Sequence, residues 1–119
     1  MIKRTTMIVG KQFHFDAAHF LPGHPTCGKI HGHTWTVDVE LQGPLGPEGM
    51  VFDFGRLKEV MDQILKNYDH SNLNDFITRP TCEIIAILIG NFLKAKLVGA
   101  ELYSVKVQEG FGGYAIYKP

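Results

Sequence analysis

The chain has 119 residues, enough for one domain with its own core and too few for two independent domains. Hydrophobic residues make up 45% and charged residues 20% of the sequence, which is typical of a globular protein and excludes a disordered or fibrous chain. Twelve basic residues balance twelve acidic ones, so no net charge draws the protein to polyanions or anionic surfaces. We therefore expect no nucleic-acid partner and no membrane partner.

The first ten residues contain two basic side chains but lack the uninterrupted apolar stretch of a signal peptide. No later segment approaches a transmembrane span in length, so a cytoplasmic location is expected. Because thiols stay reduced in that compartment, Cys27 and Cys82 are both predicted to be free. Cys82 opens an apolar segment and is predicted to pack, whereas Cys27 lies among glycines and histidines.

The clearest predicted strand covers residues 31–42, where polar and apolar side chains alternate almost perfectly. The odd positions carry the large apolar residues and therefore face the core, and His31 and His33 continue that face. An earlier strand is predicted over residues 7–18. His19 follows it at the parity of its buried side chains, so the three histidines are expected on one side of the sheet.

Residues 43–49 are rich in Gly and Pro and are predicted to form a loop that ends the second strand. Asp53 is the predicted N-cap of a helix whose apolar residues recur at intervals of three and four up to Tyr68. Thr81 is the predicted N-cap of a second helix that stops at Gly99. This helix is apolar on more than one face, so one face should meet the sheet and another the first helix or a second subunit.

Two further strands are predicted at residues 101–109 and 114–117, joined as a hairpin by residues 110–113. Glu109 ends a row of apolar side chains on an inward face, where a carboxylate needs an ion-pair partner or a ligand. The element order strand, strand, helix, helix, strand, strand indicates one α+β domain over residues 1–119. We expect a four-stranded antiparallel sheet with both helices on one face.

The histidines form a candidate metal site. Two imidazoles at i and i+2 of a strand face the same side, and His19 adds a third from the neighbouring strand, the number that leaves a catalytic zinc one open position. Cys27, four residues before His31, has two possible roles. It is either a fourth ligand that closes a structural site, or a thiolate activated as a base or nucleophile by the nearby cation.

Asp69 and His70 follow the first helix as an adjacent acid and imidazole, a pair that serves either as a proton relay or as solvated capping residues. His14 and His24 have no partner at metal-ligand spacing and are interpreted as structural or surface residues. The sequence contains no glycine-rich phosphate loop of the Walker or Rossmann type.

Several motifs occur in a fixed order: Phe15-Asp-Ala-Ala-His19, Cys27-Gly-Lys-Ile-His-Gly-His33, Asp53-Phe54, Asp69-His70, Leu73-Asn-Asp75, Pro80-Thr-Cys-Glu83 and Glu109. Together they resemble the 6-pyruvoyl-tetrahydropterin synthase superfamily along the whole chain, most closely its 6-carboxy-tetrahydropterin synthase branch. The resemblance implies the tunnelling fold, in which four-stranded sheets of several subunits close into a barrel, usually as a homohexamer. It also implies a Zn²⁺ held by His19, His31 and His33, with Cys27 as the catalytic base and not a ligand.

The same resemblance implies that Asp69 and His70 relay protons and that Glu109 grips the guanidine-like edge of a pterin. Thr81 and Glu83 would line the pterin pocket from a neighbouring subunit. One departure stands out, because the family usually has a small polar residue after the glutamate, whereas this chain has Gly-Phe-Gly-Gly.

The implied activity converts 7,8-dihydroneopterin triphosphate to 6-carboxy-5,6,7,8-tetrahydropterin with release of acetaldehyde and triphosphate, in queuosine or archaeosine synthesis. One alternative is the 6-pyruvoyl-tetrahydropterin synthase reaction, which eliminates triphosphate and retains the side chain. A second alternative is a binding module without catalysis, in which Cys27 and the histidines close a structural zinc site. A cupin-type oxygenase also uses His-x-His on a strand, but its third histidine follows that motif in the sequence. In this chain the third histidine, His19, precedes it.

Overall fold

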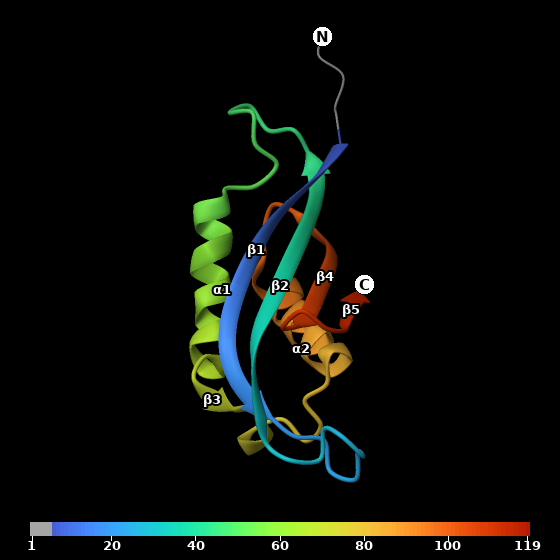
Figure 1. Ribbon diagram of the computed structural model, residues 1–119. Coiled ribbons are helices and arrows are strands. Elements are labelled where there is room, and N and C mark those ends of the chain that lie inside the picture. Colours follow the sequence, from blue (N-terminus) through green and yellow to red (C-terminus); the bar gives the residue numbers. More distant parts are fainter. Residues whose placement is uncertain (1–5) are drawn as a thin grey trace.

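The computed structural model describes residues 6–119 and shows a long, twisted sheet backed by two helices (Figure 1). The elements are β1 (Thr6–His19), β2 (His31–Pro44), α1 (Phe54–Tyr68), β3 (Ser71–Asn72), the 3-10 helix η1 (Leu73–Asp75), α2 (Cys82–Lys96), β4 (Glu101–Glu109) and β5 (Tyr114–Tyr117). Residues 1–5, part of the segment inspected for a signal peptide, lie outside the described residues. Within residues 6–119, no helix combines the length and the apolar character needed to cross a membrane.

The sheet has the strand order β3-β1-β2-β4-β5. The four predicted strands pair antiparallel as neighbours, which confirms the α+β class. The structure adds β3, a strand of two residues that pairs parallel to β1 and makes the sheet mixed. So short a segment carries no alternation for sequence reasoning to detect.

Strands β1 and β2 pair along their whole length, from Thr6 opposite Pro44 to His19 opposite His31. The prediction that the loop begins at Gly43 is wrong by two residues, since Gly43 and Pro44 still pair with β1. Proline is tolerated there because β4 pairs with β2 only as far as Gln42, so no second neighbour requires an N–H from Pro44.

Both predicted N-caps are confirmed. The carboxylate of Asp53 accepts a 2.8 Å hydrogen bond from the backbone N–H of Gly55 at the start of α1. The hydroxyl of Thr81 accepts one of 3.1 Å from the N–H of Ile84 at the start of α2. Helix α2 ends at Lys96, three residues before the predicted stop at Gly99.

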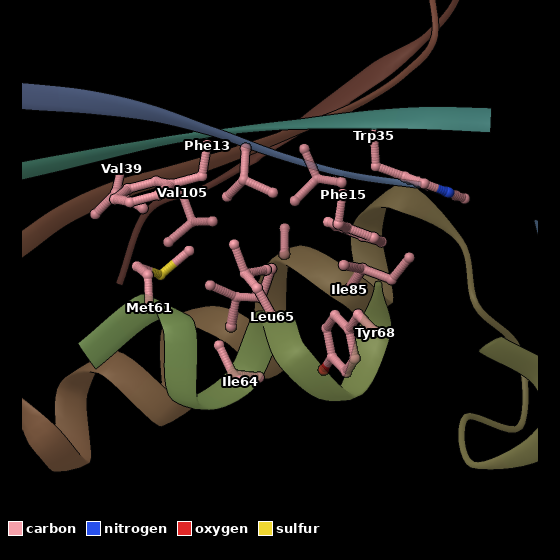
Figure 2. Packing of buried hydrophobic residues seen from close by; sticks show 14 of the residues in the cluster. Phe13, Phe15, Trp35, Val39, Met61, Ile64, Leu65, Tyr68, Ile85 and Val105 are labelled. Atoms are coloured by element: carbon pink, nitrogen blue, oxygen red, sulfur yellow. The ribbon is translucent and has the colours of Figure 1, made fainter. Parts of the chain in front are cut away.

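The two helices lie on the same face of the sheet, and the core fills the space between (Figure 2). Side chains from α1 and α2 point at the odd-numbered side chains of β1 and β2, as the alternation predicts. Labelled members of this core are Phe13, Phe15, Trp35, Val39, Met61, Ile64, Leu65, Tyr68, Ile85 and Val105. Helix α2 also carries apolar side chains outside the core, because Ile84, Ile87 and Leu88 are exposed in the single chain.

Helix α2 and strand β5 approach each other closely at one glycine. A Cβ atom built on Gly90 would lie 2.5 Å from two ring carbons of Tyr117, so any larger residue would push the ring away. The close approach lets β5 extend the sheet beside β4 while Tyr117 packs on the helix.

Candidate metal centre

The strand register brings the three predicted histidines together. His19, the last residue of β1, pairs with His31, and His33 pairs with Ala17 two positions back. The three imidazole centroids are 4.6 to 5.2 Å apart. Each ring offers one nitrogen, and with a carboxylate oxygen of Glu109 these atoms all lie within 4.8 Å of one another. In residues 6–119 this is the single group of three or more such side chains that could hold a metal ion.

Backbone carbonyl groups fix the orientation of two of the rings. Nδ1–H of His19 donates a 2.8 Å hydrogen bond to the carbonyl oxygen of Pro80, and Nδ1–H of His31 donates one of 2.7 Å to that of Lys29. A carbonyl can only accept, so the proton is on Nδ1 and, in the neutral ring, the Nε2 lone pair is free. This arrangement supports a histidine that ligates a metal through Nε2.

Two ring nitrogens of the group are buried and have no protein partner. Nε2 of His19 and Nε2 of His33 are both buried without a hydrogen bond, and the His19 side chain is completely inaccessible to solvent. Leaving one such group unsatisfied costs about 1–3 kcal/mol, so two of them converging on one point need an explanation. Burial lowers the pKa of His33, the neighbouring imidazoles add to this, and Glu109 opposes it. Zn²⁺ binds the lone pair of a neutral imidazole, and the two buried, partnerless Nε2 atoms suit such a site.

Trp35 forms the wall behind the histidines. Its ring is fully buried, stacks on Phe15 with centroids 5.8 Å apart, and meets the rings of His19 and His33 edge-on at 4.8 and 5.5 Å. Its Nε1–H donates a 3.1 Å hydrogen bond to the carbonyl oxygen of Ala17. The indole is therefore held at both ends and keeps the imidazoles in place.

Glu109 extends the group from β4, where it pairs with Trp35. Its Oε2 lies 3.4 Å from Nε2 of His19 and 3.2 Å from Nε2 of His33, and the Cys82 thiol donates to Oε1 at 3.6 Å. Burial and the Glu109 carboxylate raise the pKa of Cys82 to about 12, so this thiol stays protonated and remains a donor. Packing was the role predicted for Cys82, and the contact with Glu109 was missed. Its place between Thr81 and Glu83 in the family-like motif was the one available signal.

Cys27 lies outside this four-residue group, in the loop that joins β1 to β2. Its backbone N–H donates a 3.0 Å hydrogen bond to Nδ1 of His24, and its carbonyl oxygen accepts one of 2.7 Å from Leu21. The sulfur lies 3.8 Å from the hydroxyl oxygen of Thr26 and is partly exposed. The ring of His24 thus organises the loop, while the thiol of Cys27 stays accessible.

Asp69 and His70 are hydrogen-bonded to each other, with Nδ1 of His70 2.8 Å from Oδ2 of Asp69. Oδ1 of Asp69 accepts a 2.9 Å hydrogen bond from the N–H of Asp16, whose carbonyl oxygen accepts one of 2.6 Å from His70. These bonds hold His70 at a φ of 58°, a left-handed conformation that is uncommon for a residue with a side chain. The role of Asp16 as the anchor of this pair was missed, because the two segments are far apart in the sequence.

Asp69 and His70 each shift the pKa of the other toward its charged form. The Asp16 N–H and then the His70 imidazole lower the pKa of Asp69, and the Asp69 carboxylate raises the pKa of His70. The pair lies at the edge of β1 and His70 is largely exposed, so the single chain does not join it to the imidazole group. Glu83 is likewise exposed, in the first turn of α2, and Thr81 is engaged in capping that helix.

Comparison with known proteins agrees with this geometry. A profile described as 6-pyruvoyl tetrahydropterin synthase matches residues 8–119. An Archaeoglobus fulgidus protein provisionally named 6-carboxy-5,6,7,8-tetrahydropterin synthase is 42% identical over 103 residues, covering 87% of this chain and 88% of its own. A Pyrococcus furiosus dihydroneopterin monophosphate aldolase is 37% identical over 97 residues, covering 81% and 83%.

The fold comparison gives the same result. The structure of Caenorhabditis elegans 6-pyruvoyl tetrahydropterin synthase superposes with a TM-score of 0.90 at 28% identity, covering 100% of this chain and 99% of that one. Sequence and fold thus match a single family over nearly the entire chain, which confirms the resemblance and the fold class. The chain therefore belongs to the 6-pyruvoyl tetrahydropterin synthase family.

Proposed function

We propose that the protein is a zinc-dependent lyase that converts 7,8-dihydroneopterin triphosphate and one water molecule to 6-carboxy-5,6,7,8-tetrahydropterin, releasing acetaldehyde and triphosphate. The observation that carries the proposal is the pair of buried, partnerless Nε2 atoms on His19 and His33, inside a family of pterin synthases. His19, His31 and His33 would hold the metal. When bound, the zinc supplies Lewis acidity that makes the hydroxyl groups of the substrate side chain easier to deprotonate.

The protein's own groups would bind the pterin and move the protons. Glu109 binds the guanidine-like edge of the pterin, because a carboxylate accepts two parallel N–H groups well. Cys27, carried on the loop between β1 and β2, removes a proton from a side-chain carbon of the substrate. Asp69 accepts the Nδ1–H of His70 and leaves Nε2 of that ring to take up and return protons.

A homo-oligomer, a hexamer in this proposal, would complete the site. The exposed apolar side chains of α2 and the exposed Asp69–His70 pair in the single chain are both features that a neighbouring subunit could cover. Thr81 and Glu83 would then line the pterin pocket across the subunit boundary. The product would serve 7-deazaguanine synthesis, for queuosine or archaeosine.

Two other pterin reactions are separate candidates. The 6-pyruvoyl-tetrahydropterin synthase reaction is supported by the structural similarity to the nematode enzyme. Cleavage of dihydroneopterin monophosphate by an aldolase reaction is supported by the similarity to the Pyrococcus furiosus protein. The outcomes differ in the fate of the side chain and in the oxidation level of the ring.

The test is incubation of the zinc-loaded protein with dihydroneopterin triphosphate and, in a parallel reaction, with the monophosphate. Mass analysis of the pterin and an assay for acetaldehyde identify the products. A carboxylated tetrahydropterin with one acetaldehyde per turnover is expected. A tetrahydropterin that retains all three side-chain carbons identifies the pyruvoyl reaction, and a shortened side chain on a dihydropterin identifies the aldolase. Failure to convert either compound despite bound zinc would indicate a structural site.

A further inference from the structure

The carboxylate of Glu109 is closer to the imidazoles than a purely pterin-binding role requires. Its Oε2 lies 3.4 and 3.2 Å from Nε2 of His19 and His33, within the range of a hydrogen bond. Neither contact is a hydrogen bond, because both nitrogens have no hydrogen-bond partner. The carboxylate oxygen and the two ring nitrogens are therefore close together without being hydrogen-bonded to one another.

These separations are those of ligands that share one metal ion. In a tetrahedral site with Zn–N and Zn–O bonds of about 2.0–2.2 Å, neighbouring ligand atoms are about 3.3–3.5 Å apart. Both Glu109 distances agree with that value to within about 0.2 Å. We propose that Glu109 is an exchangeable fourth metal ligand. It closes the site in the substrate-free protein, and when substrate binds it dissociates from the metal and binds the pterin instead.

The surroundings of the Glu109 carboxylate allow it to bind either the metal or the pterin. Its Oε1 faces the Cys82 thiol, which donates at 3.6 Å, so Oε2 alone is directed at the imidazoles. The Glu109 side chain is 26% exposed and that of His33 is 27% exposed, whereas that of His19 is fully buried, so an incoming molecule can reach the carboxylate from solvent. Glu109 is also the last residue of β4 and precedes Gly110, where a φ of 49° begins the turn that leads into β5.

Substrate capture would open the metal site. A pterin edge presents two N–H donors that engage both oxygens of a carboxylate, which withdraws Oε2 from the metal. The released position is the open one that a catalytic zinc site needs for the substrate hydroxyls. This step rests on the proposed function, whereas the ligand role in the substrate-free protein does not.

Metal affinity without substrate tests the ligand role. Zinc binding is measured by competition with a chromophoric chelator for the wild type, Glu109→Gln and Glu101→Gln, with folding checked by circular dichroism. Glu101 is an exposed carboxylate at the other end of β4, so its variant removes the same charge without removing a ligand. We expect Glu109→Gln to bind zinc at least about tenfold more weakly and Glu101→Gln to match the wild type. Equal affinities for all three proteins would overturn the ligand role.

Cobalt substitution tests the exchange. The Co²⁺ protein is titrated with 6-methylpterin, which has the pterin edge but no side-chain hydroxyls, and binding is followed separately by pterin fluorescence. The visible Co²⁺ spectrum of the wild type should change in step with binding, because Glu109 leaves the metal. Binding without a spectral change overturns the exchange and leaves the proposed function standing. If 6-methylpterin does not bind, the exchange and the pterin-binding role of Glu109 both fail. The zinc-affinity measurement is independent of this result, so a weaker affinity in Glu109→Gln would still identify Glu109 as a metal ligand.

Discussion

Nδ1–H of His19 donates a 2.8 Å hydrogen bond to the carbonyl oxygen of Pro80, a residue 61 positions further along the chain. This bond joins the end of β1 to the residues just before α2. Two residues later, the Cys82 thiol contacts the carboxylate of Glu109. One short segment therefore supports an imidazole and a carboxylate of the candidate metal site, which come from two different strands. This explains how elements far apart in the sequence hold one site.

Replacing His33 with alanine should weaken zinc binding by at least about 100-fold, since it removes one of three imidazole ligands while outer-shell changes alone cost about 10–100-fold. His33 is partly exposed, so its loss should disturb the core less than loss of the buried His19. The measurement is zinc affinity by chelator competition. His14→Ala is the control, because His14 is exposed and outside the group. An unchanged affinity in His33→Ala would remove this residue from the site.

Replacing Cys27 with alanine separates the roles that the sequence left open. The thiol lies outside the group of candidate ligands, so the variant should keep its zinc and lose turnover by about 10²–10⁴-fold, the range for loss of a general base. Metal analysis and the rate with dihydroneopterin triphosphate are measured on the same sample. Loss of zinc would instead identify Cys27 as a ligand, and full activity would exclude it as the base.

Parts of the fold that depend on local patterns were predictable from the sequence. The alternation in β2 and the spacing of apolar residues in α1 are set by neighbours on one element, so the faces of both elements agree with the structure. The short strand β3 depends on its pairing with Ala17 and Ala18 of β1, which no local pattern encodes.

The candidate site divides in the same way. Strand parity places His19, His31 and His33 on one side and Glu109 at the end of an inward-facing row, and the family resemblance adds the pterin-binding role of Glu109. The carbonyl of Pro80 and the thiol of Cys82 required the packing of α2 against the sheet. The anchoring of Asp69 by Asp16 required the edge of β1, so neither contact followed from spacing.

Substitution of Asp69 by asparagine tests the ion pair with His70. The asparagine oxygen can still accept the N–H of Asp16, but the negative charge that raises the pKa of His70 is gone. The pKa of His70, followed by proton NMR of its ring, should therefore fall toward its ordinary value near 6.5. A His70 pKa that does not change would show that Asp69 does not control its protonation.

The same pair fixes the sign of its pH dependence. His70 has a raised pKa in the folded state, so its contribution is fully present below the unfolded value and is lost as pH rises through the folded pKa. Asp69 has a lowered pKa, so its contribution is present above the unfolded value and is lost as pH falls through the folded pKa. The difference in unfolding free energy between wild type and Asp69→Asn should thus be largest between the unfolded pKa of Asp69, near 3.8, and the unfolded pKa of His70, near 6.5. It should shrink at lower and at higher pH.

Gly90→Ala should destabilise the fold although alanine is the better helix former. The new Cβ would lie 2.5 Å from two ring carbons of Tyr117, and overpacking of this kind costs about 1–3 kcal/mol. That cost exceeds the gain of about 0.8–1 kcal/mol in helix propensity. Urea unfolding of Gly90→Ala, Tyr117→Ala and the double variant measures the coupling. If the clash is the cause, the double variant should be more stable than the two single effects predict; strict additivity would refute it.

The central claim is that His19, His31 and His33 hold a zinc ion on which turnover depends. It is tested most directly by adding zinc stepwise to the chelator-treated, metal-free protein and measuring the rate of product formation from dihydroneopterin triphosphate at each step. The account predicts no turnover without metal, a linear rise, and a plateau at one zinc per chain, with no such rise for His33→Ala. Turnover by the metal-free protein, or zinc bound at one per chain with no conversion of the substrate, would contradict it.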